Sequence, residues 1–236
     1  MGAFPSIRAE LAERFIFNFR MPPAVMRGLL PVDWLIPAEF NGSGVASFCM
    51  LDLRNITVAP LPTIAGLNSI SSAPRYAVMD ASGHPATPAV FVTERHTNSA
   101  CGSWFTGLGF SAPHPYVESF ISREGASTHL SVSSPEEGAM FDAVVHPANK
   151  TTSSLFDTDS FAAFIAQGVS SYGLSRHGSR LTKVELHKED ADYEPLEVLE
   201  MRGPAVDEWI RQGAVFDSAF RTARGRYEWK YLGLTK

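Results

Sequence analysis

Lysine is scarce in this chain of 236 residues: none precedes Lys150, and the other four are Lys183, Lys188, Lys230 and Lys236. The N-terminal half therefore carries its positive charge on arginine and histidine alone. The 20 lysines and arginines form no run, and the formal net charge is −5. Because no basic field is available to gather phosphates, we expect no nucleic acid partner.

Cysteines and long apolar runs are also scarce. Two cysteines, Cys49 and Cys101, are too few for a disulfide framework or a metal quartet. Their apolar or small neighbours are typical of buried free thiols, which indicates a reducing compartment. No uninterrupted apolar stretch reaches about 18 residues, and the charged segment Met1 to Glu13 does not read as a signal peptide. We therefore expect a soluble, cytoplasmic protein with no membrane partner.

The sequence gives no sign of a metal or cofactor site. The seven histidines show neither an HxH nor an HExxH spacing. Residues 107–112 formally fit a dinucleotide fingerprint, but Pro113 interrupts the helix that must begin there, and no βαβ unit surrounds it. We expect no cofactor.

Hydrophobic residues make up 44% of the chain and include 16 Phe, enough for a sizeable aromatic core. Phe15, Phe17 and Phe19 alternate with Ile16, Asn18 and Arg20, the period of a strand with one aromatic face. Similar patterns predict further strands at 45–53, 75–79, 89–96, 128–133, 140–145, 182–187, 196–201, 214–220 and 226–232.

The remaining segments predict short helices and loops. Pro22 and Pro23 favour a helix that Pro31 ends, Asp157 or Asp159 can cap a helix over 161–169, and a third covers 204–211. Residues 59–72 predict a long loop, and residues 98–115 a loop or short irregular helix. About nine strands without a βαβ repeat favour one α+β domain, 1–236, of antiparallel sheets curled into a barrel or sandwich.

Several soft motifs, in their order and spacing, resemble the acetoacetate decarboxylase-like superfamily, and more closely its YqjF-like branch, a domain of unknown function. They are Glu13 to Arg20 followed by Pro23 to Pro31, then Phe40-Asn41-Gly42, Arg75 to Val78, Phe105 to Phe110, and Phe161 to Val169 running into Ser171 to Leu174. The resemblance spans roughly residues 13 to 200. It implies a closed, barrel-like cone of mainly antiparallel strands with peripheral short helices and an internal cavity of ligand size.

The resemblance does not bring the superfamily's chemistry with it. In the decarboxylases, a lysine pair after a Gly/aromatic-Pro dipeptide forms a Schiff base. Aligned on Gly109-Phe110, this chain has Ser111, Ala112 and Pro113 instead, and no carboxylate lies between Asp52 and Asp80 where an acidic partner is expected. Lys150 is an alternative imine-forming residue, but its polar surroundings hold no second cation and favour a surface lysine. We therefore expect no amine nucleophile to face the cavity.

Six residues are candidates for the cavity. Glu94 and His96, on one side of a predicted strand, could share a proton and act in catalysis. Arg75 could hold a substrate carboxylate through its planar fork. The resemblance also brings Tyr76, Trp104 and His114 near the cavity as ligand-binding residues. The alternative is a solvent-facing charge cluster at a strand end.

Two functions of different classes remain open. The first is a protein that binds a small organic ligand and acts on a keto acid without a Schiff-base lysine. The second is a non-catalytic ligand sensor or interaction protein, and an acetoacetate decarboxylase-like lyase using Lys150 is a further alternative. Exposed sheet edges also allow a homodimer.

Overall fold

The computed structural model describes residues 5–59, 66–107, 114–175, 180–190 and 192–235, with backbone alone for 104–107 and 190. The four helices of this part of the chain are α1 (Pro23–Leu29), α2 (Ala100–Gly107), α3 (Thr158–Gln167) and α4 (Pro204–Arg211). Its strands are β1 (Ile7–Met21), β2 (Leu35–Pro37), β3 (Glu39–Phe40), β4 (Ser43–Val58), β5 (Leu67–Asp80), β6 (Thr87–Val92), β7 (His96–Thr97), β8 (Glu118–Glu124), β9 (Ser127–Ser134), β10 (Gly138–Pro147), β11 (Ser170–Leu174), β12 (Leu181–Asp190), β13 (Tyr193–Arg202) and β14 (Val215–Leu234).

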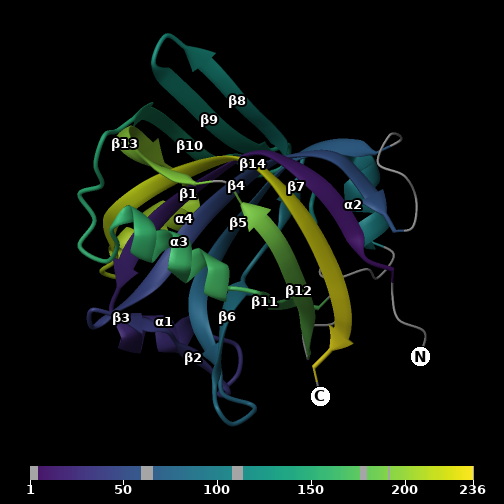
Figure 1. Ribbon diagram of the computed structural model, residues 1–236, viewed down its shortest axis with the longest axis vertical. Helices are drawn as coiled ribbons and strands as arrows, with labels where there is room; N and C mark the ends of the chain where they lie inside the picture. Colours follow the sequence, from purple (N-terminus) through teal and green to yellow (C-terminus); the bar gives the residue numbers. More distant parts are fainter. Residues whose placement is uncertain (1–4, 60–65, 108–113, 176–179, 191, 236) are drawn as a thin grey trace.

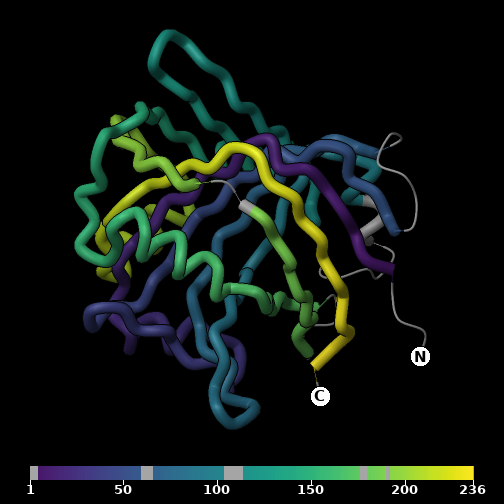
Figure 2. Tube along the Cα trace, in the orientation of Figure 1, coloured from purple at the N-terminus to yellow at the C-terminus, as the bar shows by residue number. Residues whose placement is uncertain are grey.

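Seven strands close into a barrel. Their order is β1-β4-β5-β6-β11-β12-β14, and the pairing of β1 with β14 completes the ring. Figure 2 shows these first and last strands of the chain, purple and yellow, running side by side. The pairings are antiparallel except that β6 and β11 run parallel. The predicted barrel-like, mainly antiparallel fold is confirmed.

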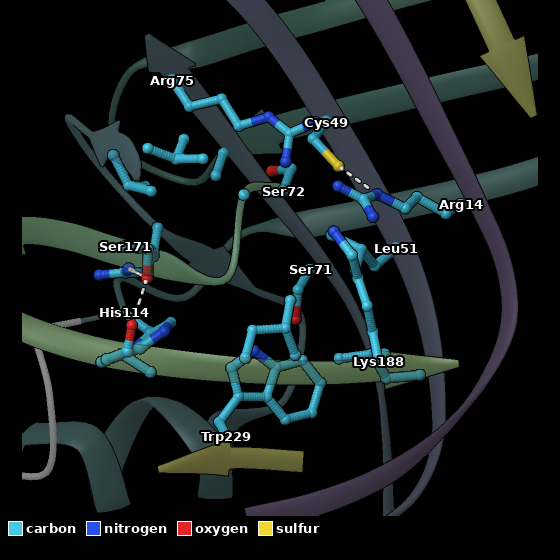
Figure 3. Close-up of a pocket in the computed structure, with 18 of the residues that line it drawn as sticks. Arg14, Cys49, Leu51, Ser71, Ser72, Arg75, His114, Ser171, Lys188 and Trp229 are labelled. Carbon is cyan, nitrogen blue, oxygen red and sulfur yellow. Dashed lines mark hydrogen bonds between the residues drawn. The ribbon is translucent and has the colours of Figure 1, made fainter. Parts of the chain in front are cut away.

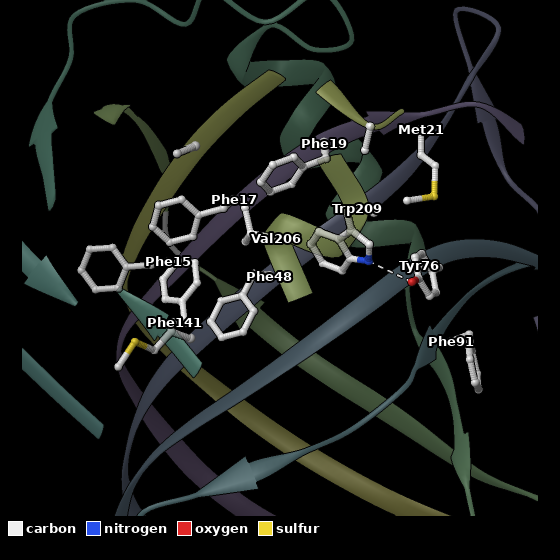
Figure 4. Packing of buried hydrophobic residues seen from close by; sticks show 14 of the residues in the cluster. Phe15, Phe17, Phe19, Met21, Phe48, Tyr76, Phe91, Phe141, Val206 and Trp209 are labelled. Carbon is white, nitrogen blue, oxygen red and sulfur yellow. Dashed lines mark hydrogen bonds between the residues drawn. The ribbon is translucent and has the colours of Figure 1, made fainter. Parts of the chain in front are cut away.

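A second layer covers the outside of the barrel. Strands β13, β10, β9 and β8 continue the sheet from β14, and the β8–β9 hairpin projects beyond the barrel in Figure 1. The aromatic face of β1 packs beneath this layer and α4 (Figure 4). The ring of Phe141 stacks 4.0 Å from that of Phe48 and lies edge-on to Phe17, while Phe19 meets Trp209. The largest hydrophobic core is therefore outside the barrel wall.

This arrangement leaves the other face of each wall strand for the barrel interior. Because successive side chains of a strand point to opposite faces, burying Phe15, Phe17 and Phe19 outside turns Arg14 and Ile16 inward. Helix α3 then closes one side of the interior, with Phe164 and Ile165 among the residues that line it. The side chain of Asp157 caps α3 by accepting a hydrogen bond from the Ser160 amide at 2.7 Å, so one of the two predicted caps is confirmed.

Several predicted boundaries were wrong. Residues 67–72 of the predicted loop belong to β5. Their backbone pairs with β4, and the polar local sequence did not predict this pairing. The two predicted strands at 214–220 and 226–232 are one long β14, and β8 and β11 were missed. The predicted strand 89–96 ends at Val92 and resumes only as the short β7. Between β3 and β4, Asn41 and Gly42 both have the positive φ that a tight two-residue turn needs.

A buried carboxylate ties the β5 end of the barrel to β11 and β12. Asp80 accepts hydrogen bonds from the Ser82 hydroxyl at 2.6 Å and the Ser82 amide at 2.9 Å, and also from the Tyr172 hydroxyl. The Lys183 ammonium lies 3.7 Å from the same carboxylate. Burial raises the pKa of Asp80, but the hydrogen bonds from Ser82 and Tyr172, with the Lys183 charge, outweigh it and hold the pKa below its usual value.

We expect Asp80→Asn to lower the free energy of unfolding at pH 7 by about 1–3 kcal/mol, because it weakens several hydrogen bonds to a charged group. A depressed folded-state pKa stabilises the fold above the unfolded pKa, near 4, and this contribution is lost as the pH falls through the folded value. Urea unfolding between pH 7 and pH 2.5 should therefore show the gap to wild type narrowing below about pH 4. Glu136→Gln, in the exposed β9–β10 turn, is the control. A gap that stayed constant with pH would contradict this account.

Candidate anion-binding cavity

The barrel interior holds a cavity of about 410 Å³. Its walls come from the inward faces of β1, β4, β5, β6, β11, β12 and β14, with α2 and α3 contributing at its edges. Most of the lining is apolar, including Leu51, Val92, Val184 and Trp229. A cavity of this size and character is typical of a site for a small organic molecule, and the hollow interior implied by the family resemblance is present.

Sheet register gathers two arginines around one cysteine. Cys49 on β4 pairs with Ile16 of β1 and Ala73 of β5. Arg14 and Arg75 each lie two residues from these partners and therefore on the same inward face, diagonal to Cys49. The Arg14 Nε donates a hydrogen bond to the Cys49 sulfur at 3.3 Å. Figure 3 shows both arginines directed toward this cysteine.

Arg14 is held rigidly in this position. It is 2% exposed, and its Nη1 donates to the hydroxyl groups of Tyr227 at 3.1 Å and Tyr193 at 3.5 Å. In these contacts the guanidinium donates to two tyrosine hydroxyl groups and to a cysteine sulfur. Arg14 can hold its charge against the cavity wall in a fixed orientation.

The arginines change the protonation of the cysteine. Burial raises the pKa of the Cys49 thiol, but the positive charges of Arg75 and Arg14, with a smaller contribution from Lys188, outweigh burial and place the pKa below its ordinary value. Burial lowers the pKa of Arg75, and its interaction with Cys49 partly opposes that shift. Cysteine and arginine therefore stabilise each other's charged forms.

Two further cations line the cavity. Arg95 donates from Nη2 to the Ser171 hydroxyl at 3.1 Å, and burial lowers its pKa to about 10. The Lys188 ammonium, on β12, donates to the Ile165 carbonyl of α3 and lies on the cavity wall, where Figure 3 shows it directed toward the Arg14 and Cys49 region. The expectation that no amine faces the cavity was wrong, because Lys188 shares the inward face of β12 with Val184 and Leu186. Lys150 is exposed and lies outside the lining.

Among the described residues, the lining of the cavity includes cations but no acid. Arg14, Arg75, Arg95 and Lys188 contribute positive charge, yet none of the described residues that line the cavity is Asp or Glu. Within the described part of the chain, no carboxylate lies within ion-pair distance of Arg75. Because buried charges are normally paired, the guanidinium of Arg75 stands out as one without a carboxylate partner among the described residues.

The predicted Glu94 and His96 contact exists, although not on one strand. Glu94 follows the end of β6, and His96 belongs to β7, which pairs with Ser72 of β5. The His96 Nε2 lies 3.1 Å from the Glu94 Oε2, at ion-pair distance but without hydrogen-bond alignment, and this contact lowers the pKa of Glu94. On the other side of the ring, Nδ1 lies 3.3 Å from the Ser72 hydroxyl. His96 is 2% exposed and lines the cavity, whereas the Glu94 side chain is 51% exposed and does not.

The other predicted residues have different outcomes. Arg75 and His114 line the cavity as expected. Tyr76 does not: it turns into the outer core, where its hydroxyl accepts a hydrogen bond from the Trp209 indole at 2.9 Å (Figure 4). The prediction for Tyr76 was wrong because neighbouring residues of a strand cannot face the same side. The side chain of Trp104, and residues 108–113 with Ser111 and Ala112, lie outside what the structure describes.

Sequence reasoning missed Arg14, Cys49, Arg95 and Lys188 as parts of one site. A signal existed for Arg14, which alternates with the phenylalanines of β1 and must therefore face away from them. Cys49 and Lys188 come from strands far apart in the sequence. Only the register of the closed barrel brings them together.

A second, more open groove lies between α3 and strands β1, β12 and β14, and Lys188 lines both this groove and the interior cavity. Its volume is about 970 Å³, and its lining mixes acids with bases, including Glu10, Asp159, Arg226 and Glu228. Its lining therefore includes carboxylates, unlike the described lining of the interior cavity. In the described residues, no group of three His, Cys, Asp or Glu side chains could hold a metal ion. The described helices are all too short or too polar to span a membrane.

Comparison with solved structures identifies the architecture. Acetoacetate decarboxylase from Legionella pneumophila superposes with a TM-score of 0.69, over 100% of this chain and 90% of that one, at 10% sequence identity. This chain has the acetoacetate decarboxylase-like fold. An acetoacetate decarboxylase-like enzyme from Sphingomonas wittichii RW1 gives a TM-score of 0.64 at 12% identity, covering 100% and 93% of the two chains. The enduracididine biosynthesis enzyme MppR gives 0.66 at 12% identity, covering 100% and 89%.

Comparison of sequences alone finds no relative of this chain. No protein-family model matches the chain, and a search of curated protein sequences finds no match. At identities of 10–12%, these solved structures establish the fold. The chemistry has to be argued from the cavity of this chain.

Proposed function

We propose that the barrel cavity binds a small organic acid. The observation that carries this proposal is the position of Arg75, whose guanidinium lines a largely apolar space and has no carboxylate within ion-pair distance in the described part of the chain. Arg14, Arg95 and Lys188 line the same space. A carboxylate would offset the mutual repulsion of these cations, and its carbon skeleton would contact the apolar wall.

Arg75 is the residue best suited to bind the carboxylate. Among the described residues its guanidinium makes no ion pair, so its planar fork can donate hydrogen bonds to both oxygens of a carboxylate. Arg14 is already engaged by Cys49, Tyr193 and Tyr227. Among solved structures of similar fold, MppR is described in complex with pyruvate, a small keto acid, which supports this class of ligand here.

We expect 2-oxo and 3-oxo acids of three to six carbons to raise the melting temperature and to bind in isothermal titration calorimetry, while the matching amides do not. A ligand at about 100 times its Kd stabilises by about 2.7 kcal/mol, which a thermal shift detects. Arg75→Gln should weaken binding about tenfold to a hundredfold, the cost of losing a charged hydrogen-bond pair.

Arg202→Gln, at an exposed position on β13, is the matched control and should bind like wild type. Equal binding of the acids and their amides would refute an anion-binding cavity. So would a panel in which no acid binds.

Glu94 and His96 are the groups we assign to proton transfer. His96 connects the cavity to Glu94 and to the Ser72 hydroxyl, so its ring could carry a proton between ligand and solvent. If a bound acid is consumed, His96→Ala should abolish its consumption, followed by proton NMR, while changing its Kd by less than about threefold. His129→Ala, exposed on β9, should leave turnover unchanged. Binding without consumption of any acid would favour the alternative, a ligand sensor.

An imine-forming lyase is a second candidate, favoured by the position of Lys188 in the cavity wall. Figure 3 shows its ammonium directed toward Arg14, and a neighbouring cation can activate a lysine for Schiff-base formation. If this candidate is correct, borohydride reduction with acetoacetate or pyruvate should leave a covalent adduct on Lys188, found by peptide mass spectrometry. Lys188→Arg should remove the adduct, and exposed Lys150 should carry none. Bound acid without an adduct would exclude this mechanism.

A further inference from the structure

We propose that Cys49 is a nucleophile of this cavity, which adds to an electrophilic carbon bonded directly to the carboxylate of the bound acid, as in a 2-oxo acid. This inference rests on the proposed anion binding and specifies its chemistry. It makes Cys49, rather than a lysine, the residue that bonds to the ligand.

The position of the sulfur supports this role. Cys49 is 2% exposed, so its contact with small molecules is through the cavity that it lines. The adjacent strand β5 places Arg75 diagonally across from it on the same face. A carboxylate held by Arg75 would therefore present its neighbouring carbon toward the sulfur.

The positive charge around the Cys49 sulfur also supports its role as a nucleophile. Arg14 donates a hydrogen bond to the Cys49 sulfur, and Arg75 and Lys188 add positive charge nearby. This surrounding favours the thiolate, which is the reactive form of cysteine. Structural cysteines in apolar surroundings have the opposite preference. The hydrogen bond from the Arg14 guanidinium therefore sets Cys49 apart from a cysteine that only fills space in a core.

The reaction is a reversible addition that balances without a co-reactant. The thiolate sulfur forms a bond to the carbonyl carbon of the 2-oxo acid, and the π pair of the C=O bond moves to oxygen. The resulting alkoxide takes up a proton equivalent to the one that the thiol gave up. The product is a hemithioketal, nothing is oxidised or reduced, and the arginine that holds the carboxylate remains in place throughout.

Two alkylating reagents of nearly equal size test the proposal. Iodoacetate carries an electrophilic carbon next to a carboxylate, and iodoacetamide is its neutral counterpart. In each case the sulfur displaces iodide and forms a thioether. We expect the iodoacetate-to-iodoacetamide rate ratio at Cys49, measured by peptide mass spectrometry of the native protein, to exceed that of N-acetylcysteine by about tenfold or more. Exposed Cys101 verifies that both reagents are active.

Variants locate the effect. Arg75→Gln should return the ratio at Cys49 to that of N-acetylcysteine, and Arg75→Lys should restore part of the preference. Carbon-13 NMR with pyruvate labelled at C2 should show a hemithioketal signal that Cys49→Ser removes, while Cys49→Ser still binds pyruvate in calorimetry. The wild-type ratio needs no variant, so the test stands even if one substitution prevents folding.

Several outcomes would overturn the proposal. They are a Cys49 that reacts with neither reagent in the native protein, a ratio equal to that of N-acetylcysteine, and a preference that survives Arg75→Gln. If oxo acids bind but Cys49 shows no preference, the nucleophile assignment fails and the anion-binding function stands. If no acid binds and no preference is seen, both fail together.

Discussion

The two faces of the barrel wall determine what the interior can be. A strand offers alternate residues to opposite sides, so the side that receives the aromatic residues decides the chemistry of the other. In β1, the rings of Phe15, Phe17 and Phe19 are buried outside the barrel, beneath α4 and the β8–β10 layer. The large side chains that could have filled the barrel are therefore used elsewhere, and the interior has room for a cavity with Arg14 on its wall.

The local pattern of the sequence predicts much of this wall, but it does not predict its orientation. Alternation identifies β1, β9, β10 and β12, and the capping residue Asp157 marks the start of α3. Alternation also requires Arg75 and Tyr76 to face opposite sides, so assigning both to one cavity was an avoidable error. Alternation does not tell which of the two faces points into the barrel. That depends on which face the second layer covers, and contacts between distant residues decide it, such as that of Phe48 with Phe141, 93 residues apart in the chain.

The candidate site was less predictable than the fold for the same reason. Arg75 and His114 could be named because the family resemblance brings their segments to the cavity, and His96 because it ends a recognisable strand pattern. Cys49 and Lys188 have ordinary local sequences, and their importance comes from register across the closed ring, with β4 and β12 separated by three strands on one side. A cysteine becomes reactive through its neighbours, and those neighbours are set by tertiary structure.

Unbalanced charge is costly for a folded protein to maintain. Gathering Arg14, Arg75, Arg95 and Lys188 on one largely apolar cavity removes solvation from each and adds repulsion among them, and burial already lowers the pKa of both Arg75 and Arg95. A thiolate at Cys49 offsets part of this cost for the two nearest arginines. Among the described residues no carboxylate pairs with Arg75, so the proposed carboxylate ligand would offset its charge. The cost of holding Arg75 in this wall is therefore the physical reason for proposing that an anion binds beside Cys49.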